Sequence, residues 1–204
     1  MAHKPSSGLP VVSPGLTGYC RPMHSTHTAY RLGSSIGLIG GAVFVWVNQA
    51  ALTAAASWSA ILAWAALLAL AIWNVWIRPK PLNNLRAPRP RAGLIYGLAC
   101  LGMVLLIVLG SRVLTSSRHE AATPALVALA VGLHFLPFSH AFNAPFFLRL
   151  GGAMAVLGAI GLILALAVGA PWGAGFAVLA GLAMTALVAF GARWNQGQLT
   201  RRGA

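Results

Sequence analysis

The chain has 204 residues, of which 58% are hydrophobic and 7% are charged, and its formal net charge is +13 at pH 7. About a quarter of the residues of a soluble domain are charged, so this composition excludes an ordinary soluble globular protein. The apolar stretches are continuous rather than alternating, which excludes a transmembrane β-barrel. The sequence therefore predicts an all-α fold, a polytopic transmembrane helical bundle.

The first segment, residues 1–32, is rich in Pro, Gly, Ser and His. It lacks the roughly 7–15-residue apolar region of a cleavable signal peptide, and its composition predicts a disordered cytoplasmic tail. Cys20, His24 and His27 form a C-x3-H-x2-H pattern there. Structural zinc sites use four ligands, and this set has three on a flexible segment, so we predict no metal site.

The apolar stretches of residues 33–192 predict a six-helix transmembrane domain. A helix crosses the hydrocarbon core of about 30 Å with about 20 apolar residues, and six uncharged stretches are long enough. We expect the spans at 34–53, 56–77, 93–111, 123–142, 150–169 and 172–191. The connections between spans 1 and 2 and between spans 5 and 6 are very short, which predicts tight helical hairpins. Residues 193–204 predict a basic cytoplasmic tail.

The distribution of positive charge predicts how this domain is threaded. Basic residues are commoner in cytoplasmic than in external connections. With the N-terminus inside, the outer side holds Arg112 and Arg118, and the inner side holds the other twelve: Lys4, Arg21, Arg31, Arg78, Lys80, Arg86, Arg89, Arg91, Arg149, Arg193, Arg201 and Arg202. We therefore expect six spans with both termini cytoplasmic. Arginine outnumbers lysine and alanine is abundant, which is typical of a GC-rich bacterial genome. We expect the spans to lie in the cell (inner or plasma) membrane.

The connection at 78–91 contains four prolines and five basic residues. Proline lacks an amide donor and clashes with the preceding turn, so this segment is not helical. It is typical of a positively charged anchor that contacts anionic lipids at the cytoplasmic face. The alternative is a docking site for a partner protein or nucleic acid. Because no aromatic residue is interleaved with the basic ones, we predict no nucleic-acid partner.

Small residues recur along several spans at helical spacing. Helices in lipid associate through close backbone approach, for which glycine and alanine are suited. The most regular stripes are Gly33, Gly37 and Gly41 in span 1 and Gly173, Ala177 and Gly181 in span 6. We expect them to pack helices within the bundle; the alternative is a homodimer face on span 6. An inverted repeat of three plus three spans is compatible with the topology.

His134 is the deepest titratable side chain of the predicted spans. It lies ten residues after Pro124, about 15 Å along a helix and therefore near the middle of the bilayer. Pro137 cannot bond the carbonyl of Leu133, which frees an acceptor beside His134 and predicts a kink. Two interpretations stay open: a neutral ring hydrogen-bonded across the bundle, or a proton-relay or substrate-binding residue. His140 is six residues away, which is the wrong spacing for a metal pair on one helix.

Asn48, Gln49 and Asn74 are the other polar residues expected at depth. Such residues usually form hydrogen bonds between helices. The alternative is that they line a small polar cavity together with His134.

The segment that reads GLHFLPFSHAF, from Gly132 onward, resembles an uncharacterised family of small bacterial multi-pass membrane proteins with a G-L-H-F-x-P motif. The resemblance covers residues 131–138 and, loosely, spans 3 to 6. It implies no known activity, and it draws attention to Gly132, His134 and Pro137.

The near absence of acidic residues restricts the chemistry. Glu120 is the single acid, in an outer loop, so paired-carboxylate sites are excluded, and we expect no catalytic residue and no cofactor. The sequence favours a non-enzymatic bundle in the lipid bilayer that assembles with or modulates other envelope components, as a homo-oligomer or with a membrane-protein partner. The alternative is a small transporter or channel in which His134 lines a polar cavity.

Overall fold

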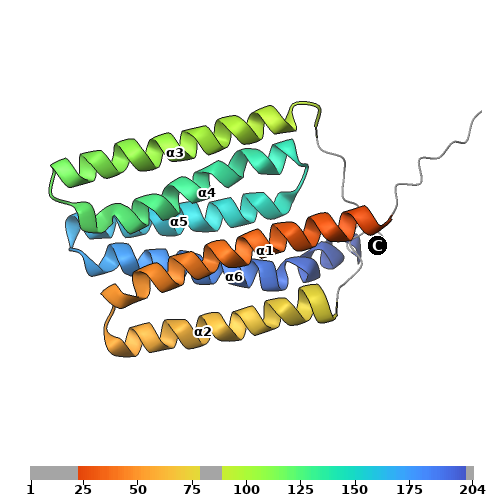
Figure 1. The fold of residues 1–204 in the computed structure, drawn as a ribbon, viewed down its shortest axis with the longest axis horizontal. Coiled ribbons are helices and arrows are strands. Elements are labelled where there is room, and N and C mark those ends of the chain that lie inside the picture. The colour runs from red at the N-terminus through yellow and green to blue at the C-terminus, as the bar shows by residue number, and fades with distance from the viewer. Residues whose placement is uncertain (1–22, 79–88, 201–204) are drawn as a thin grey trace, which may run out of the picture.

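The computed structural model describes residues 23–78 and 89–200, and every regular element in those ranges is helical (Figure 1). Six of the helices are long and apolar enough to cross a membrane, which confirms the predicted number of spans. They are α1 (Met23–Asn48), α2 (Ala54–Ile72), α3 (Ala92–Ser116), α4 (Thr123–Ala141), α5 (Pro145–Ala167) and α6 (Pro171–Thr200). Short turns extend three of them: the 3-10 turns η1 (Gln49–Ala51) and η3 (Glu120–Ala122), and the π-helical turn η2 (Trp73–Ile77).

Several helices extend beyond the predicted spans. α1 begins at Met23, inside the segment predicted to be a disordered tail, and residues 1–22 lie outside the described residues. α5 begins at Pro145, ahead of the span expected from 150, because proline fits the first helical position, where no amide donor is needed. Likewise α6 continues to Thr200, into the predicted basic tail. Hydropathy detects the part of a helix that fits in lipid, whereas backbone hydrogen bonding continues through polar turns at its ends.

The start of α4 differs from both arrangements that its sequence allows, a Thr123 N-cap or a capping box from Ser117 to Glu120. Thr123 is the first helical residue, and Ala122 precedes it without a side-chain cap, because η3 leads directly into the helix. The Ser117 hydroxyl instead donates to the carbonyls of Val113, at 2.7 Å, and Leu114, at 3.2 Å. Ser117 therefore serves the end of α3 and not the start of α4.

α6 lies at the centre of the arrangement, in contact with α1, α2, α4 and α5, while α2 and α3 lie at opposite edges (Figure 1). α3 packs on α4 and on the turn η3 between them. The α1–α2 connection is short, as predicted, but these two helices pack mainly through α6. Leu38 of α1 and Val75 of α2 belong to one buried cluster with Val188 of α6. The first hairpin is thus held open by α6 and is not a tight hairpin.

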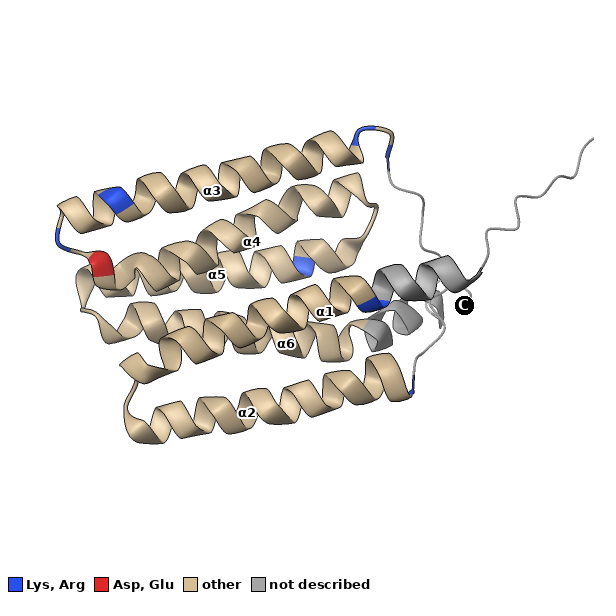
Figure 2. Ribbon diagram, in the orientation of Figure 1, with Lys and Arg blue, Asp and Glu red and all other residues tan. Residues whose placement is uncertain are grey.

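The two ends of the bundle differ in charge (Figure 2). We call the end with the α3–α4 connection the Glu120 end and the opposite end the Arg89 end. The Glu120 end carries Arg112, Arg118 and Glu120, whereas the described basic residues towards the Arg89 end are Arg31, Arg78, Arg89, Arg91 and Arg149. The remaining predicted inner charges, Lys4, Arg21, Lys80, Arg86, Arg193, Arg201 and Arg202, lie outside the residues whose side chains are described.

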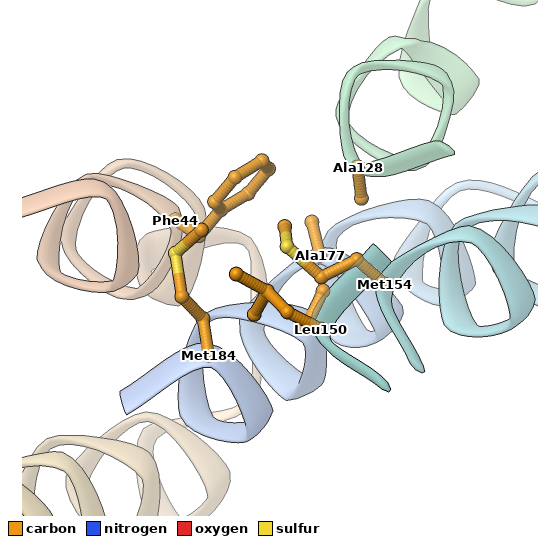
Figure 3. Close-up of a cluster of buried hydrophobic side chains, with 7 residues drawn as sticks. Phe44, Ala128, Leu150, Met154, Ala177 and Met184 are labelled. Atoms are coloured by element: carbon orange, nitrogen blue, oxygen red, sulfur yellow. The ribbon is translucent and has the colours of Figure 1, made fainter. Parts of the chain in front are cut away.

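The centre of the bundle is filled by apolar side chains from four helices (Figure 3). Phe44 of α1 and Met184 of α6 approach Leu150 and Met154 of α5, and Met154 is fully buried. Ala128 of α4, with Ala177 and Ala180 of α6, completes this central cluster. Protein interiors pack as densely as organic crystals, so these contacts provide much of the attraction that holds the helices together.

Candidate functional site

The small-residue stripes predicted on spans 1 and 6 lie against each other where α1 crosses α6. A Cβ atom added to Gly181 would lie 2.7 Å from the Gly41 carbonyl oxygen, and one added to Gly41 would overlap the Thr185 hydroxyl. That hydroxyl donates to the Gly181 carbonyl at 2.9 Å, and Ala177, one turn earlier, is fully buried. Gly37 faces Val188, whose Cγ2 lies 2.9 Å from the added Cβ position. The backbones meet closely here because no side chain separates them.

The other two predicted packing glycines have different surroundings. Gly173, at the start of α6, faces the Ala121 carbonyl oxygen, which lies 2.5 Å from where its Cβ would be. It therefore packs α6 against η3 and not against α1. Gly33 is exposed, and no atom outside its own helix lies within 4 Å of its Cβ position.

The closest helix crossing, between α4 and α5, was not predicted. A Cβ on Gly132 would lie 2.7 Å from the Ala155 Cα, and a Cβ on Gly158 would lie 2.6 Å from the Leu129 Cα. Gly151 faces the Gly132 carbonyl oxygen at 2.7 Å. The signal was present as glycines seven residues apart on span 5, at Gly151 and Gly158, two turns of one face. Gly132, which the resemblance singled out, is one half of this crossing.

His134 lies half-buried on α4 and bonds to its own helix. Its Nδ1 donates to the Val131 carbonyl at 2.5 Å, one turn back, and not to a neighbouring helix. This leaves Nε2 of the neutral ring with a lone pair that is free to accept a hydrogen bond. The ring lies against Phe135, with centroids 4.1 Å apart, and meets Phe138 edge-on at 5.2 Å.

The aromatic side chains around His134 form one connected cluster towards the Arg89 end. Phe138 is its buried centre and stacks on Tyr96 of α3 at 5.1 Å. Phe147 of α5 meets Phe138 edge-on at 5.8 Å and also contacts Phe135 and Phe142. Aromatic pairs at such separations add attraction beyond their buried area. α4 runs without a break through Pro137, whose ring is exposed, so the predicted kink does not interrupt the helix.

The polar residues Asn48, Gln49 and Asn74 are placed far from His134 and not together. Asn48 donates to the Phe44 carbonyl of its own helix at 2.8 Å, and the Gln49 side-chain oxygen accepts from the Ser57 hydroxyl, both at the Glu120 end. Asn74 lies in η2 near the Arg89 end, buried, and donates to the Ala189 carbonyl of α6 at 2.9 Å. Asn74 thus joins two helices, and in the part of the chain described here these residues do not share a cavity with His134.

The end of the proline-rich connection is attached to the α4–α5 turn through Arg89. Its backbone amide donates to the Ala141 carbonyl at 2.9 Å. Its guanidinium donates to His140 Nε2 at 2.6 Å and reaches the Asn143 side-chain oxygen at 3.5 Å. Asn143 adopts a left-handed conformation, with φ of 50°, which asparagine tolerates better than most residues. The residues from 79 to 88 that precede Arg89 lie outside the described residues.

α3 leaves most of its surface outside the bundle. Buried residues make up 6% of its most apolar stretch, against 56% for α6. Gly93, Gly97 and Gly102 have no neighbouring atom within 4 Å of their Cβ positions, and Leu98, Leu101 and Val104 around them are exposed. α3 thus carries glycines without the close helix contact that Gly41, Gly132, Gly158 and Gly181 make.

The described side chains include no group of three or more His, Cys, Asp or Glu residues that could hold a metal ion. Cys20, of the tail pattern, lies outside the described residues. Comparisons with protein-family models, with curated proteins and with solved structures gave no match. The resemblance to proteins with a G-L-H-F-x-P motif therefore stays a prediction.

Proposed function

We propose that this chain is a non-enzymatic protein of a bacterial cell membrane, with both termini cytoplasmic, that assembles with or modulates other envelope components. Six apolar helices make it compatible with an integral membrane protein. The orientation rests on charge: the Arg89 end is the more basic, and basic connections stay on the cytoplasmic side. The same residues bring anionic lipid headgroups to that face.

The observation that carries this proposal is the exposed face of α3. Membrane helices associate through small residues that let backbones approach. Gly93 and Gly97, one turn apart, form such a pair on a helix that contacts one neighbouring helix, α4. The central cluster supports the proposal because Phe44, Met154 and Met184 fill the space in which a transport path would run. We infer that another transmembrane helix, of a second copy or of a different membrane protein, packs on α3 at Gly97.

The experiment uses a photo-crosslinking residue at Leu101, one turn from Gly97, in native membranes. We expect a discrete protein adduct of fixed mass, identified by mass spectrometry as this chain or another membrane protein. Gly97→Leu should abolish the adduct, because a leucine there would keep the partner backbone away. Since nothing lies within 4 Å of the Gly97 Cβ position, the variant should fold normally.

Gly152→Leu is the matched control. Gly152 lies on α5 and also has no neighbour within 4 Å of its Cβ position. Leucine there therefore tests the effect of a larger side chain on a helix other than α3. The adduct at Leu101 should survive this change. If the crosslinker captures lipid only, or if both variants lose the adduct equally, α3 is not the assembly face.

One observation favours the alternative function, a small transporter or channel. His134 has a half-buried ring whose Nε2 has no partner among the described residues, as a relay or substrate contact requires. His134→Gln should then abolish proton-coupled uptake in vesicles containing the purified protein, whereas Asn48→Gln should not. Uptake that is absent in the wild type, or that is unchanged in His134→Gln, would eliminate this alternative.

A further inference from the structure

A recess of about 310 Å³ opens at the Glu120 end. Its lining comes from the α3–α4 connection on one side and from the end of α5 and the α5–α6 turn on the other. Its volume is at the lower end of the range for small-molecule pockets, about 300–1,000 Å³. The residues that line it include Arg118, His119, Ala122, Ala165, Val168 and Gly169.

One wall of the recess supplies cationic and hydrogen-bond-donating side chains. Neither Arg118 nor His119 has a side-chain partner among the described residues, and neither is paired with the neighbouring Glu120. Arg118 adopts a left-handed conformation, with φ of 59°. A non-glycine residue rarely adopts this region, and such residues cluster at functional sites. The His119 amide donates to the Leu114 carbonyl at 2.7 Å, which holds this turn against the end of α3.

The opposite wall supplies acceptors. The amides of Val168 and Gly169 both donate to the Leu164 carbonyl, at 2.8 and 3.2 Å, and the Trp172 amide donates to Gly169. Because these amides donate elsewhere and Pro171 has none, no backbone hydrogen bond of the described turn reaches the carbonyls of residues 165–168. The last carbonyls of a helix need partners, and they carry the negative end of the helix dipole.

The geometry points to a binding site for an amine-bearing phosphate ester, such as the headgroup of phosphatidylethanolamine. Arg118 and His119 would donate to the phosphate oxygens, as guanidinium groups do in phosphate sites. The ammonium group would donate to the carbonyls of residues 165–168, which attract cations. Ala165 and Val168 provide apolar walls for the carbon atoms. A simple anion would accept hydrogen bonds from Arg118 and His119, but the carbonyl oxygens of the opposite wall would repel it.

The test measures lipid retention by native mass spectrometry of the full chain in detergent. The probes are phosphatidylethanolamine and phosphatidylcholine with identical acyl chains, because the choline headgroup lacks N–H donors. We expect about tenfold or greater preference for phosphatidylethanolamine, the scale of one good charge-assisted hydrogen bond. The double variant Arg118→Gln, His119→Gln should lose that preference.

Arg112→Gln is the matched control, since Arg112 lies at the same end of the bundle but does not line the recess. It should keep the preference of the wild type. Equal retention of the two lipids by the wild type would overturn the site. So would a loss of preference that is as large in Arg112→Gln as in the double variant, or a double variant that behaves as wild type.

Soluble phosphoethanolamine distinguishes the two sources of this chemistry. If it displaces the bound lipid at millimolar concentration, the recess takes the free phosphate ester; if it does not, the recess takes the lipid, whose acyl chains add attraction. Inorganic phosphate should displace neither the bound lipid nor bound phosphoethanolamine. If inorganic phosphate displaced the lipid as effectively as phosphoethanolamine does, the role of the carbonyl wall would be overturned.

Discussion

α6 and α3 are both long apolar helices, yet α6 lies at the centre of the bundle and α3 lies at its edge. α6 touches four other helices, and two of its glycines meet a backbone: Gly181 meets Gly41, and Gly173 meets Ala121. α3 touches one other long helix, and Gly93 and Gly97 meet nothing within 4 Å. The membrane-spanning part of α3 is also more apolar than that of α6. Hydropathy therefore places a helix in the membrane, whereas the neighbours of its small residues decide whether it lies inside the bundle.

The largest expected effect of this difference is on folding. Gly181→Leu should destabilise the bundle by about 3 kcal/mol or more, because its Cβ alone would lie 2.7 Å from the Gly41 carbonyl oxygen. Gly97→Leu should change stability by less than about 0.5 kcal/mol, as exposed substitutions do. Unfolding of the purified chain in mixed micelles measures both. Similar losses in the two variants would remove the distinction between the helices.

A smaller effect should follow from emptying the central cluster. Met154 is fully buried, so Met154→Ala would leave a cavity between α5 and α6 and cost about 2 kcal/mol. Met103 of α3 is half-buried, and Met103→Ala should cost less than half as much. The same unfolding assay reports both values. Equal costs would mean that the centre is loosely packed.

The smallest effect concerns single hydrogen bonds. Asn74 bonds across to α6, whereas Asn48 bonds within its own helix. Asn74→Leu should cost about 0.5–1 kcal/mol, the usual value of an interhelical hydrogen bond in a membrane protein. Asn48→Leu should be close to neutral. If Asn48→Leu cost more stability than Asn74→Leu, the Asn74 side chain would not be what joins α2 to α6.

Much of the fold was predictable because lipid imposes a simple rule on length and polarity. All six spans follow from uncharged stretches of about 20 residues. The helix ends at Met23 and Thr200 did not follow, because polar turns outside lipid carry no hydropathy signal. The start at Pro145 did not follow because Arg149 interrupts the apolar stretch. The predicted start of the fourth span at 123 matches α4, but η3 leads into the helix in place of a side-chain cap.

Packing was predictable only where a stripe was regular. The repeat of Gly37 and Gly41 and the stripe through Gly181 marked helices that do approach closely. The α4–α5 crossing at Gly132 and Gly158 was missed because α4 contains a single glycine, Gly132, and therefore shows no regular stripe. Gly33 has the same spacing as Gly37 yet has no neighbour, because it lies where α1 extends towards the Arg89 end.

The neighbours of the candidate polar residues could not be predicted from the sequence either. His134, Asn48 and Asn74 were each placed at depth by counting along a helix, but counting does not say which way a side chain faces or which helix is beside it. The His134 bond to Val131 and the Asn74 bond to Ala189 depend on rotation and pairing. The Arg118 and His119 recess was not predicted either, since its two walls come from different connections.

The most direct test of the account is a nitroxide scan of α3 and α6 in purified, lipid-reconstituted protein lacking Cys20 and Cys100. Labels at Leu98, Leu101 and Val104 should collide readily with oxygen dissolved in lipid, because these positions of α3 are exposed. Labels at Ala174, Ala177 and Ala180 should be shielded from oxygen and from a water-soluble relaxation agent, because these positions of α6 are buried. Access of the water-soluble agent to α6, or shielding of α3 that persists when the protein is diluted to one copy per vesicle, would contradict a closed bundle centred on α6 with α3 as its open edge.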